Sequence, residues 1–234
     1  CYAAERARPT SIGSDATGNT EGNTRAARPL KQLAARMFLV TPLRDTLRRL
    51  PQVLIGLLLF GMGVAFMVAG DLGTAPWDVF HQGVARVSDI SLGVVIMLTG
   101  IVVVLGFLPL REKIGLGTIL NALLIGVSVN WTLGWLDRPD ALWARIALTT
   151  SGPIIIALAS GLYIGGGLGP GPRDGIMTGF AKRGFTVWKV RTILELSVMT
   201  LGIFLGGRIG FGTAWFAISI GPMVQFFLPR FVIR

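Results

Sequence analysis

Apolar runs separated by short polar segments dominate the sequence from Pro51 onward. Each run is about 17 to 22 residues long, enough for a helix to cross a hydrocarbon core of about 30 Å. The chain is 52% hydrophobic and 15% charged, whereas a soluble domain carries roughly a quarter charged residues. We therefore predict an all-α membrane protein with about six transmembrane helices, near residues 52–70, 91–110, 117–136, 146–165, 188–206 and 212–229.

Two motifs of the first half of the chain return in the second half. Asp71-Leu-Gly-Thr-Ala-Pro-Trp-Asp78 is echoed by Gly167-Leu-Gly-Pro-Gly-Pro-Arg-Asp174, and Ile114-Gly-Leu-Gly-Thr118 by Ile209-Gly-Phe-Gly-Thr213. Three runs per half is an odd number, so the second copy would enter the membrane upside down. We predict one membrane domain built from two inverted three-helix repeats, residues 51–137 and 138–234.

A short helical stretch follows the Gly/Pro loop in each half, at 77–88 and at 175–184. Both stretches are too short and too polar to cross the bilayer. Irregular backbone at membrane depth is tolerated only where protein or water covers it. We therefore predict a re-entrant or interfacial helix in each half.

Basic residues predict the orientation. Residues 1–50 hold nine Lys/Arg against four Asp/Glu, in a chain of net charge +10. Because Lys and Arg gather on the cytoplasmic side of membranes, we expect both termini there and the lipid bilayer, not nucleic acid, as the partner. We predict that residues 1–30 are disordered, and that 30–50 form either an amphipathic helix on the inner leaflet or a basic linker. Pro51 is expected in the first turn of the first membrane helix.

The chain has one Cys and one His, which argues against a disulfide framework, a metal site or a His/Cys cluster. The Cys is residue 1, where we expect a truncated or mis-started reading frame rather than a lipidated terminus. No nucleophile elbow, catalytic carboxylate pair or nucleotide-binding loop is present, so we expect no catalytic residue, no enzyme activity and no cofactor.

The strongest candidate site consists of the two short-helix starts. Pro76 and Pro172 each precede an Asp by two residues, namely Asp78 and Asp174. A helix start with Pro in its first turn exposes backbone N–H groups that favour anions, and Arg173 would reinforce this in the second copy. We expect a small anionic solute between the two starts. The two Asp residues either neutralise these helix starts or bind a cation or coupled proton.

Two further charged or titratable sets have a functional and a structural interpretation. Glu195 falls inside a predicted span with Arg191 one turn before it, and the two form either a coupling group or an i,i+4 ion pair. His81 lies one turn after Asp78 and either relays protons or is a packed polar residue.

Small and polar side chains inside the spans point to helix packing. Asn121, Asn130 and Gln225 either line a cavity or hydrogen-bond between helices. Small-residue stripes predict that spans 52–70 and 146–165 pair at the centre, and would also suit a homodimer; they comprise Gly61, Ala65 and Ala69, and Ala157, Gly161 and Gly165. Tryptophans near predicted span ends read as interface anchors, namely Trp77, Trp131, Trp135, Trp143 and Trp188.

These motifs together resemble the YczE/YyaS/YitT family of bacterial integral membrane proteins. The matching elements are the two Gly/Pro loops, Ile114-Gly-Leu-Gly-Thr118, Gly210-Phe-Gly-Thr213 and Ile220-Gly-Pro222, in this order over nearly all of residues 51–230. The resemblance implies a multi-pass protein of the bacterial cytoplasmic membrane.

The inverted halves favour a small secondary transporter or permease with its site between them. The alternative is a non-transporting adaptor that supports the assembly or regulation of another protein through its basic N-terminal segment. An intramembrane enzyme would have only Glu195, His81 and the two Asp residues to work with, and it ranks last.

Overall fold

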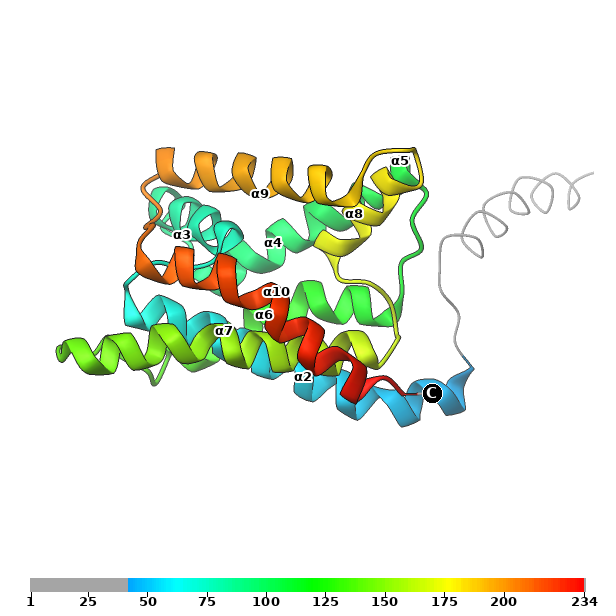
Figure 1. Cartoon of the computed structure of the whole chain (residues 1–234), viewed down its shortest axis with the longest axis horizontal. Helices are drawn as coiled ribbons and strands as arrows, with labels where there is room; N and C mark the ends of the chain where they lie inside the picture. Colours follow the sequence, from blue (N-terminus) through cyan, green and yellow to red (C-terminus); the bar gives the residue numbers. More distant parts are fainter. Residues whose placement is uncertain (1–41, 234) are drawn as a thin grey trace, which may run out of the picture. The chain divides into compact units, whose positions relative to one another are not determined.

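The computed structural model describes residues 42–233 (Figure 1). The predictions for Cys1, for residues 1–30 and for most of 30–50 concern residues outside this range. Within it the chain is helical, as predicted. The helices are α2 (Leu43–Gly70), α3 (Pro76–Ser88), α4 (Leu92–Leu105), α5 (Phe107–Leu110), α6 (Leu116–Leu133), α7 (Leu142–Gly165), α8 (Pro172–Ala181), α9 (Val187–Phe204) and α10 (Phe211–Phe231).

Five stretches of the described chain are long and apolar enough to cross a membrane: α2, Leu92–Leu110, α6, α7 and α10. The sixth predicted span forms α9, which is 18 residues long. It falls outside these five because Lys189, Arg191 and Glu195 interrupt its apolar sequence.

Helix α2 begins earlier than the sequence predicted. Pro51 does not occupy the first turn; it lies inside a continuous helix that starts at Leu43. Tertiary hydrogen bonds hold the turns around it, since Arg49 Nη1 donates to Gly166 O (3.4 Å) and Gln52 Nε2 donates to Leu162 O (2.9 Å). These bonds hold the α2 turns on either side of Pro51 against the end of α7.

Helices α2 and α7 form the centre of the fold, which confirms the predicted pairing of these two segments. They run antiparallel and approach closely at glycines seven residues apart. An added Cβ at Gly56 would lie 2.8 Å from Tyr163 N, one at Gly63 would lie 2.9 Å from Gly152 O, and one at Gly70 would lie 2.8 Å from Arg145 O.

The predicted small-residue stripes face other neighbours. A Cβ at Gly61 would lie 2.7 Å from Ile125 O on α6, and one at Gly161 would lie 3.1 Å from Phe227 Cβ on α10. The stripes thus pack α6 onto α2 and α10 onto α7. The sequence pattern identified the right pair of helices through residues on the wrong faces.

Each Gly/Pro loop binds a helix start in the other half of the chain. The Gly212 N–H donates to Leu72 O (2.8 Å), and the Gly117 N–H donates to Leu168 O (2.9 Å). The loops also require glycine. Gly73 has φ +106° and Gly169 φ +133°, and a Cβ at Gly73 would lie 2.6 Å from Gly210 N.

The short helices also rest on the opposite half. Helix α3 packs on α9, where a Cβ at Gly83 would lie 2.7 Å from Gly202 O. Helix α8 packs on α4 and α5 of the first half, with Gly175 directly against the ring of Phe107. The two halves are therefore held together through both short helices.

Asp71, at the end of α2, contacts three arginines from later segments of the chain. Its carboxylate lies 2.9 Å from Arg138 Nη1 and 3.4 Å from Arg145 Nη2, and it also accepts a hydrogen bond from Arg208. Arg86 Nη1 donates to Gly206 O over 3.4 Å, and Gly206 is two residues before Arg208 in the chain. These arginines thus gather at one end of the helices.

A methyl group at the α2–α7 contact should destabilise the fold. We expect Gly63→Ala to lower the free energy of unfolding by about 1–3 kcal/mol, because the new Cβ meets backbone that cannot move independently. For a protein of this size the melting temperature should fall by about 2–12 °C in detergent.

Gly221→Ala is the matched control, since a Cβ there has no neighbour within 4 Å. It should melt no lower than the wild type. Equal melting temperatures for Gly63→Ala and Gly221→Ala would contradict the close approach of α2 and α7.

Candidate functional site

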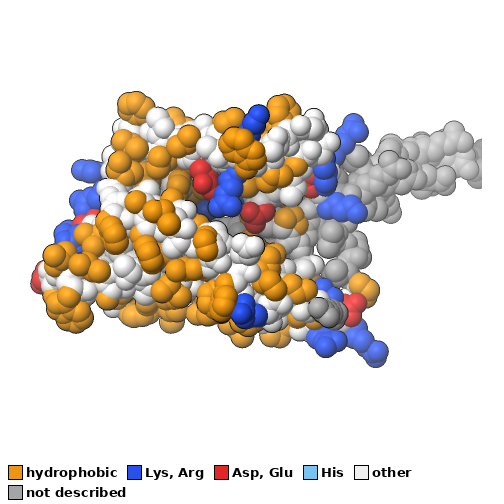
Figure 2. Space-filling model, in the orientation of Figure 1, with side chains coloured by type: hydrophobic (Ala, Val, Ile, Leu, Met, Phe, Trp, Pro, Cys, Tyr) orange, Lys and Arg blue, Asp and Glu red, His pale blue; other side chains and the backbone are white. Residues whose placement is uncertain are grey.

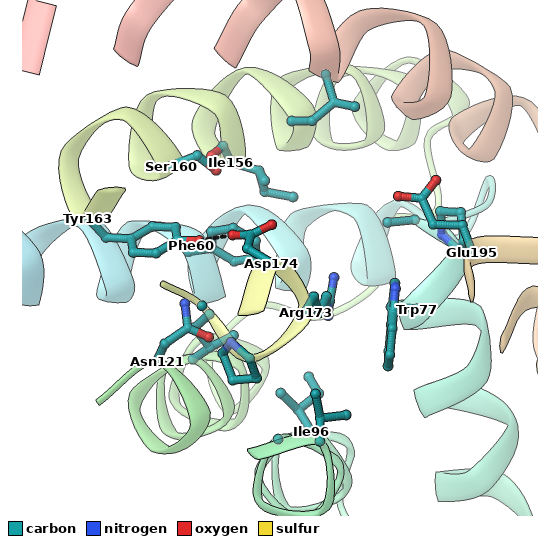
Figure 3. Close-up of a pocket in the computed structure, with 18 of the residues that line it drawn as sticks. Phe60, Trp77, Ile96, Asn121, Ile156, Ser160, Tyr163, Arg173, Asp174 and Glu195 are labelled. Carbon is teal, nitrogen blue, oxygen red and sulfur yellow. Dashed lines mark hydrogen bonds between the residues drawn. The ribbon is translucent and has the colours of Figure 1, made fainter. Parts of the chain in front are cut away.

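A cavity of about 260 Å³ lies between the helices of the two halves (Figure 3). Most of its wall is apolar, with side chains such as Phe60, Ile96 and Ile156. Its polar and charged members are His81, Thr99, Asn121, Ser160, Tyr163, Arg173, Asp174, Arg191 and Glu195, together with the Trp77 indole. The cavity combines a hydrophobic wall with convergent polar groups, as small-molecule sites do.

The starts of α3 and α8 both border this cavity. Pro76 and Pro172 occupy the first positions of the two helices, as expected from their fixed φ and missing N–H, and both line the cavity. The structure therefore brings together the two segments that the sequence motif singled out.

Arg173 connects the two helix starts directly. Its guanidinium carbon lies 4.9 Å from the centre of the Trp77 ring, and its Nη2 lies 3.9 Å from Asp78 Oδ1. A guanidinium over an indole face is a cation–π arrangement. A positive charge on α8 is thus fixed against the first turn of α3.

Asp78 and His81 form a buried pair at the cavity, where His81 lines the wall and Asp78 lies behind it. Their side chains are each 2% exposed, and His81 Nδ1 lies 3.3 Å from Asp78 Oδ1. Burial lowers the pKa of His81, while the Asp78 carboxylate opposes this shift. A neutral imidazole with its proton on Nδ1 would donate to Asp78. His81 is also packed against the rings of Trp77 and Phe80, as its structural interpretation predicted.

Asp174 has a different partner, the hydroxyl group of Tyr163. The Tyr163 O–H donates to Asp174 Oδ2 over 2.9 Å, and the dashed line in Figure 3 marks this bond. Sequence analysis missed Tyr163. The available signal was a tyrosine within an apolar run, in a chain that has only two tyrosines.

Arg191 and Glu195 form the predicted i,i+4 ion pair on α9. Arg191 Nε donates to Glu195 Oε1 over 2.9 Å, with the two side chains 50% and 31% exposed. Both residues line the cavity. The i,i+4 ion pair is therefore present in the structure, and a coupling role for the same pair stays a prediction.

The three amide side chains that were predicted to line a cavity or join helices lie in different places. Asn121 is buried and lines the cavity. Asn130 instead joins α6 to α4, since its Oδ1 accepts the Gly93 N–H (2.8 Å) and its Nδ2 donates to Ser91 Oγ (3.0 Å). Gln225 lies on α10 and is not among the described residues that line the cavity.

Trp77 is not an interface anchor. It is only 6% exposed because α3 turns back into the protein at Pro76, whereas the other four predicted anchors are 55–76% exposed. Its buried Nε1 has no hydrogen-bond partner among the described residues. Figure 3 shows the nitrogen-bearing edge of this ring turned toward the side of the cavity where Glu195 lies. An unpaired buried N–H costs about 1–3 kcal/mol, so this group offers an open donor.

The described residues contain no group of three or more His, Cys, Asp and Glu side chains that could hold a metal ion. The site is thus a set of two arginines, two acids and neutral donors around an apolar space.

Apolar helices around an internal, charge-lined cavity define this chain as an integral membrane protein. It belongs to the family of unknown function DUF6198, which matches residues 47–229.

Its relatives include an uncharacterized protein of Haemophilus influenzae, 39% identical over 75% of this chain and 81% of the relative. The uncharacterized membrane protein YczE of Bacillus subtilis is 34% identical over 75% of this chain and 83% of the relative, and the uncharacterized protein YyaS of that organism is 22% identical over 75% and 90%. These matches confirm the predicted family. No solved structure matches the chain.

The buried His81 should make stability depend on pH. Because its pKa is lowered from 6.5 in the folded protein, the unfolded chain binds the extra proton first as the pH falls. Stability is then lost progressively below about pH 6.5, by at most about 1.4 kcal/mol per pH unit.

His81→Gln should remove this dependence, and His81 is the only histidine in the chain. The difference in melting temperature between the two proteins should change between pH 7.5 and 5.5, with the wild type losing more. Parallel pH curves would show that His81 does not titrate differently in the folded state.

Proposed function

We propose that the protein is a small secondary transporter or permease that binds its solute between the starts of α3 and α8. The single observation that carries this proposal is the contact of Arg173 with Trp77 and Asp78 at the wall of the cavity. Transporters built from inverted repeats place their sites near the midplane, where broken-helix starts from the two halves converge.

The reciprocal loop contacts support an inverted-repeat interpretation. The loop around Leu72 receives the N–H of Gly212, and the loop around Leu168 receives that of Gly117. The same contact thus occurs twice, with the roles of the halves exchanged. A pseudo-twofold axis of this kind gives two related states of similar energy, which is what alternating access requires.

Helices α3 and α8 suit re-entrant elements. They have 13 and 10 residues, or about 20 and 15 Å of length, which is shorter than a hydrocarbon core of about 30 Å. Helix α9 would be the sixth span, placing both termini on the cytoplasmic side of a bacterial inner membrane and the Asp71 arginine cluster on the other side.

Solute exchange would then proceed by rocking of one half against the other around the cavity. Arg173, Asp174 and the open Trp77 N–H provide charge and hydrogen bonding, while the apolar wall excludes water and strengthens both. A negatively charged group of the solute would lie against Arg173. The Arg191–Glu195 pair is the candidate coupling group, because it lines the same cavity.

Substitutions at the helix starts should abolish ligand binding without loss of protein. We expect some members of a panel of metabolites and ions to raise the melting temperature of the purified wild type, because a ligand that binds only the folded state stabilises it. Asp78→Asn, Arg173→Ala and Asp174→Asn should each lose that rise at normal membrane levels. Asp89→Asn, at an exposed residue outside the cavity, is the matched control.

Retention of the ligand response in all three variants would exclude this site. Loss of it in Asp89→Asn as well would show that the response does not report on the cavity.

Removal of residues 1–41 separates transport from the adaptor hypothesis. A transporter should keep its ligand response, because every cavity residue lies in α2 or later. An adaptor that works through the basic N-terminal segment should keep its fold and lose its cellular phenotype. Loss of the phenotype with an unchanged ligand response would favour the adaptor.

A further inference from the structure

Helices α4 and α6 are in close backbone contact. Asn130 on α6 accepts the Gly93 N–H of α4 over 2.8 Å. A Cβ at Gly93 would overlap the carbonyl oxygen of Gly126, so the two backbones touch. This seam leaves no path between α4 and α6 into the cavity at that level.

The corresponding helices of the second half, α9 and α10, are not in close contact, and the line between them is called the α9–α10 seam below. Helix α10 packs on α7, while α9 packs on α3 and α8. Arg191 and Glu195 of α9, and Phe216 and Ile220 of α10, line the cavity between them. A Cβ at Gly221 on α10 would meet nothing within 4 Å.

The sequence itself prevents the second seam from closing as the first does. Ser91 and Thr186 directly precede α4 and α9, so the two helices correspond at an offset of 95 positions. Gly221 then corresponds to Gly126, but Trp188 stands where the first half has Gly93. An indole cannot make the close backbone contact of a glycine, so α9 and α10 cannot pack through the contact that joins α4 to α6.

Charge lies in this opening, within an apolar surround. Arg191 and Glu195 lie four and eight residues beyond Val187, about 6 and 12 Å along the axis of α9. Exposed hydrophobic side chains precede them on the same face of α9, since Val187 and Trp188 lie one turn before Arg191. Figure 2 shows acidic and basic side chains in a hollow between two bands of hydrophobic side chains. Half-exposed charges facing lipid are costly unless a polar group covers them.

The charges of the cavity wall sum to zero. Two arginines, Arg173 and Arg191, are balanced in number by Asp174 and Glu195. The buried Asp78 also lies beside Arg173, so the site has no excess positive charge to attract an anion. Arg173 and Asp174 are neighbours of opposite sign, beside the open N–H of Trp77. A head group that carries both charges matches this wall better than an anion does.

We propose that the α9–α10 seam is a lateral portal from the lipid phase, and that the ligand is a zwitterionic single-chain amphiphile. Its head reaches Arg173 and Asp174, and its chain lies between α9 and α10. The cavity of about 260 Å³ equals about nine water volumes, a space of the size of a head group, with the chain outside it between the two helices. This inference rests on the proposed function, because it uses the same cavity.

The test compares amphiphiles and soluble head groups on the purified full chain in a neutral maltoside detergent. The probes are lysophosphatidylcholine (zwitterionic), lysophosphatidylglycerol (anionic) and glycerophosphocholine (the zwitterionic head without a chain). We expect the melting temperature to rise by about 5–10 °C at one hundred times the Kd of lysophosphatidylcholine. The other two probes should have markedly weaker effects, and Asp174→Asn should abolish the rise.

Gly221→Trp should block the portal and remove the rise, while its melting temperature without ligand stays near that of the wild type. Val127→Trp, at a 49% exposed residue of α6, is the control that should keep the rise. If Gly221→Trp does not fold, Gly221→Cys in a Cys1→Ser background, alkylated with maleimides of increasing size, provides the same obstruction after folding.

Four outcomes would contradict the proposal of a portal for a zwitterionic amphiphile. A stronger Asp174-dependent response to lysophosphatidylglycerol would replace the zwitterion by an anion. A soluble solute that stabilises the wild type and Gly221→Trp equally through Asp174 would refute lateral entry and leave the transporter proposal standing. A dimer by light scattering that Gly221→Trp converts to a monomer would assign the seam to a second copy. No Asp174-dependent response to any probe or panel solute would reject both proposals.

Discussion

The structure depends on the need to pair the backbone polar groups of two irregular loops inside an apolar protein. In a membrane such groups have no water to bind, so protein must provide their partners. Leu72 O and Leu168 O obtain theirs from Gly212 and Gly117, each across the boundary between the halves. Because each loop is held by the other half, neither half completes its own fold. The short helices that follow the loops are consequently directed into the space between the halves.

This exchange determines the chemistry of the cavity. Helix α8 begins where its loop ends, and Arg173 in its first turn reaches Trp77 and Asp78 in the first turn of α3. Charged residues at such depth are stable only when paired, and the cavity provides pairs at Arg173–Asp78, Tyr163–Asp174 and Arg191–Glu195. Among the described cavity-lining residues, the Trp77 N–H is a buried donor without a protein partner. A site with one open donor beside opposite charges has the features of a binding site rather than of a purely structural core.

The sequence predicted the helices well because their signals are local. Apolar runs, Pro76 and Pro172 marked the helices and their starts within a few residues. The start of α2 was wrong, since only tertiary bonds from Arg49 and Gln52 explain a helix that continues through Pro51. Helix α9 was predicted as the sixth span, but Lys189, Arg191 and Glu195 keep it outside the five stretches that are apolar enough to cross a membrane.

The candidate site was predictable in part. The repeated motif pointed to the two helix starts, but it could not show that they meet, since that depends on which half each loop binds. Tyr163 and the burial of Trp77 follow from long-range packing. Similarly, the small-residue stripes identified α2 and α7 as partners, while the glycines in contact were Gly56, Gly63 and Gly70.

The central claim is that the starts of α3 and α8 meet at the cavity. A double-mutant cycle with Trp77→Leu, Arg173→Ala and the double variant measures this contact directly through the free energy of unfolding. A guanidinium over a buried indole predicts a favourable coupling of about 1–2 kcal/mol. Additive effects of the two substitutions, with no coupling, would contradict the meeting of the two helix starts and the site built on it.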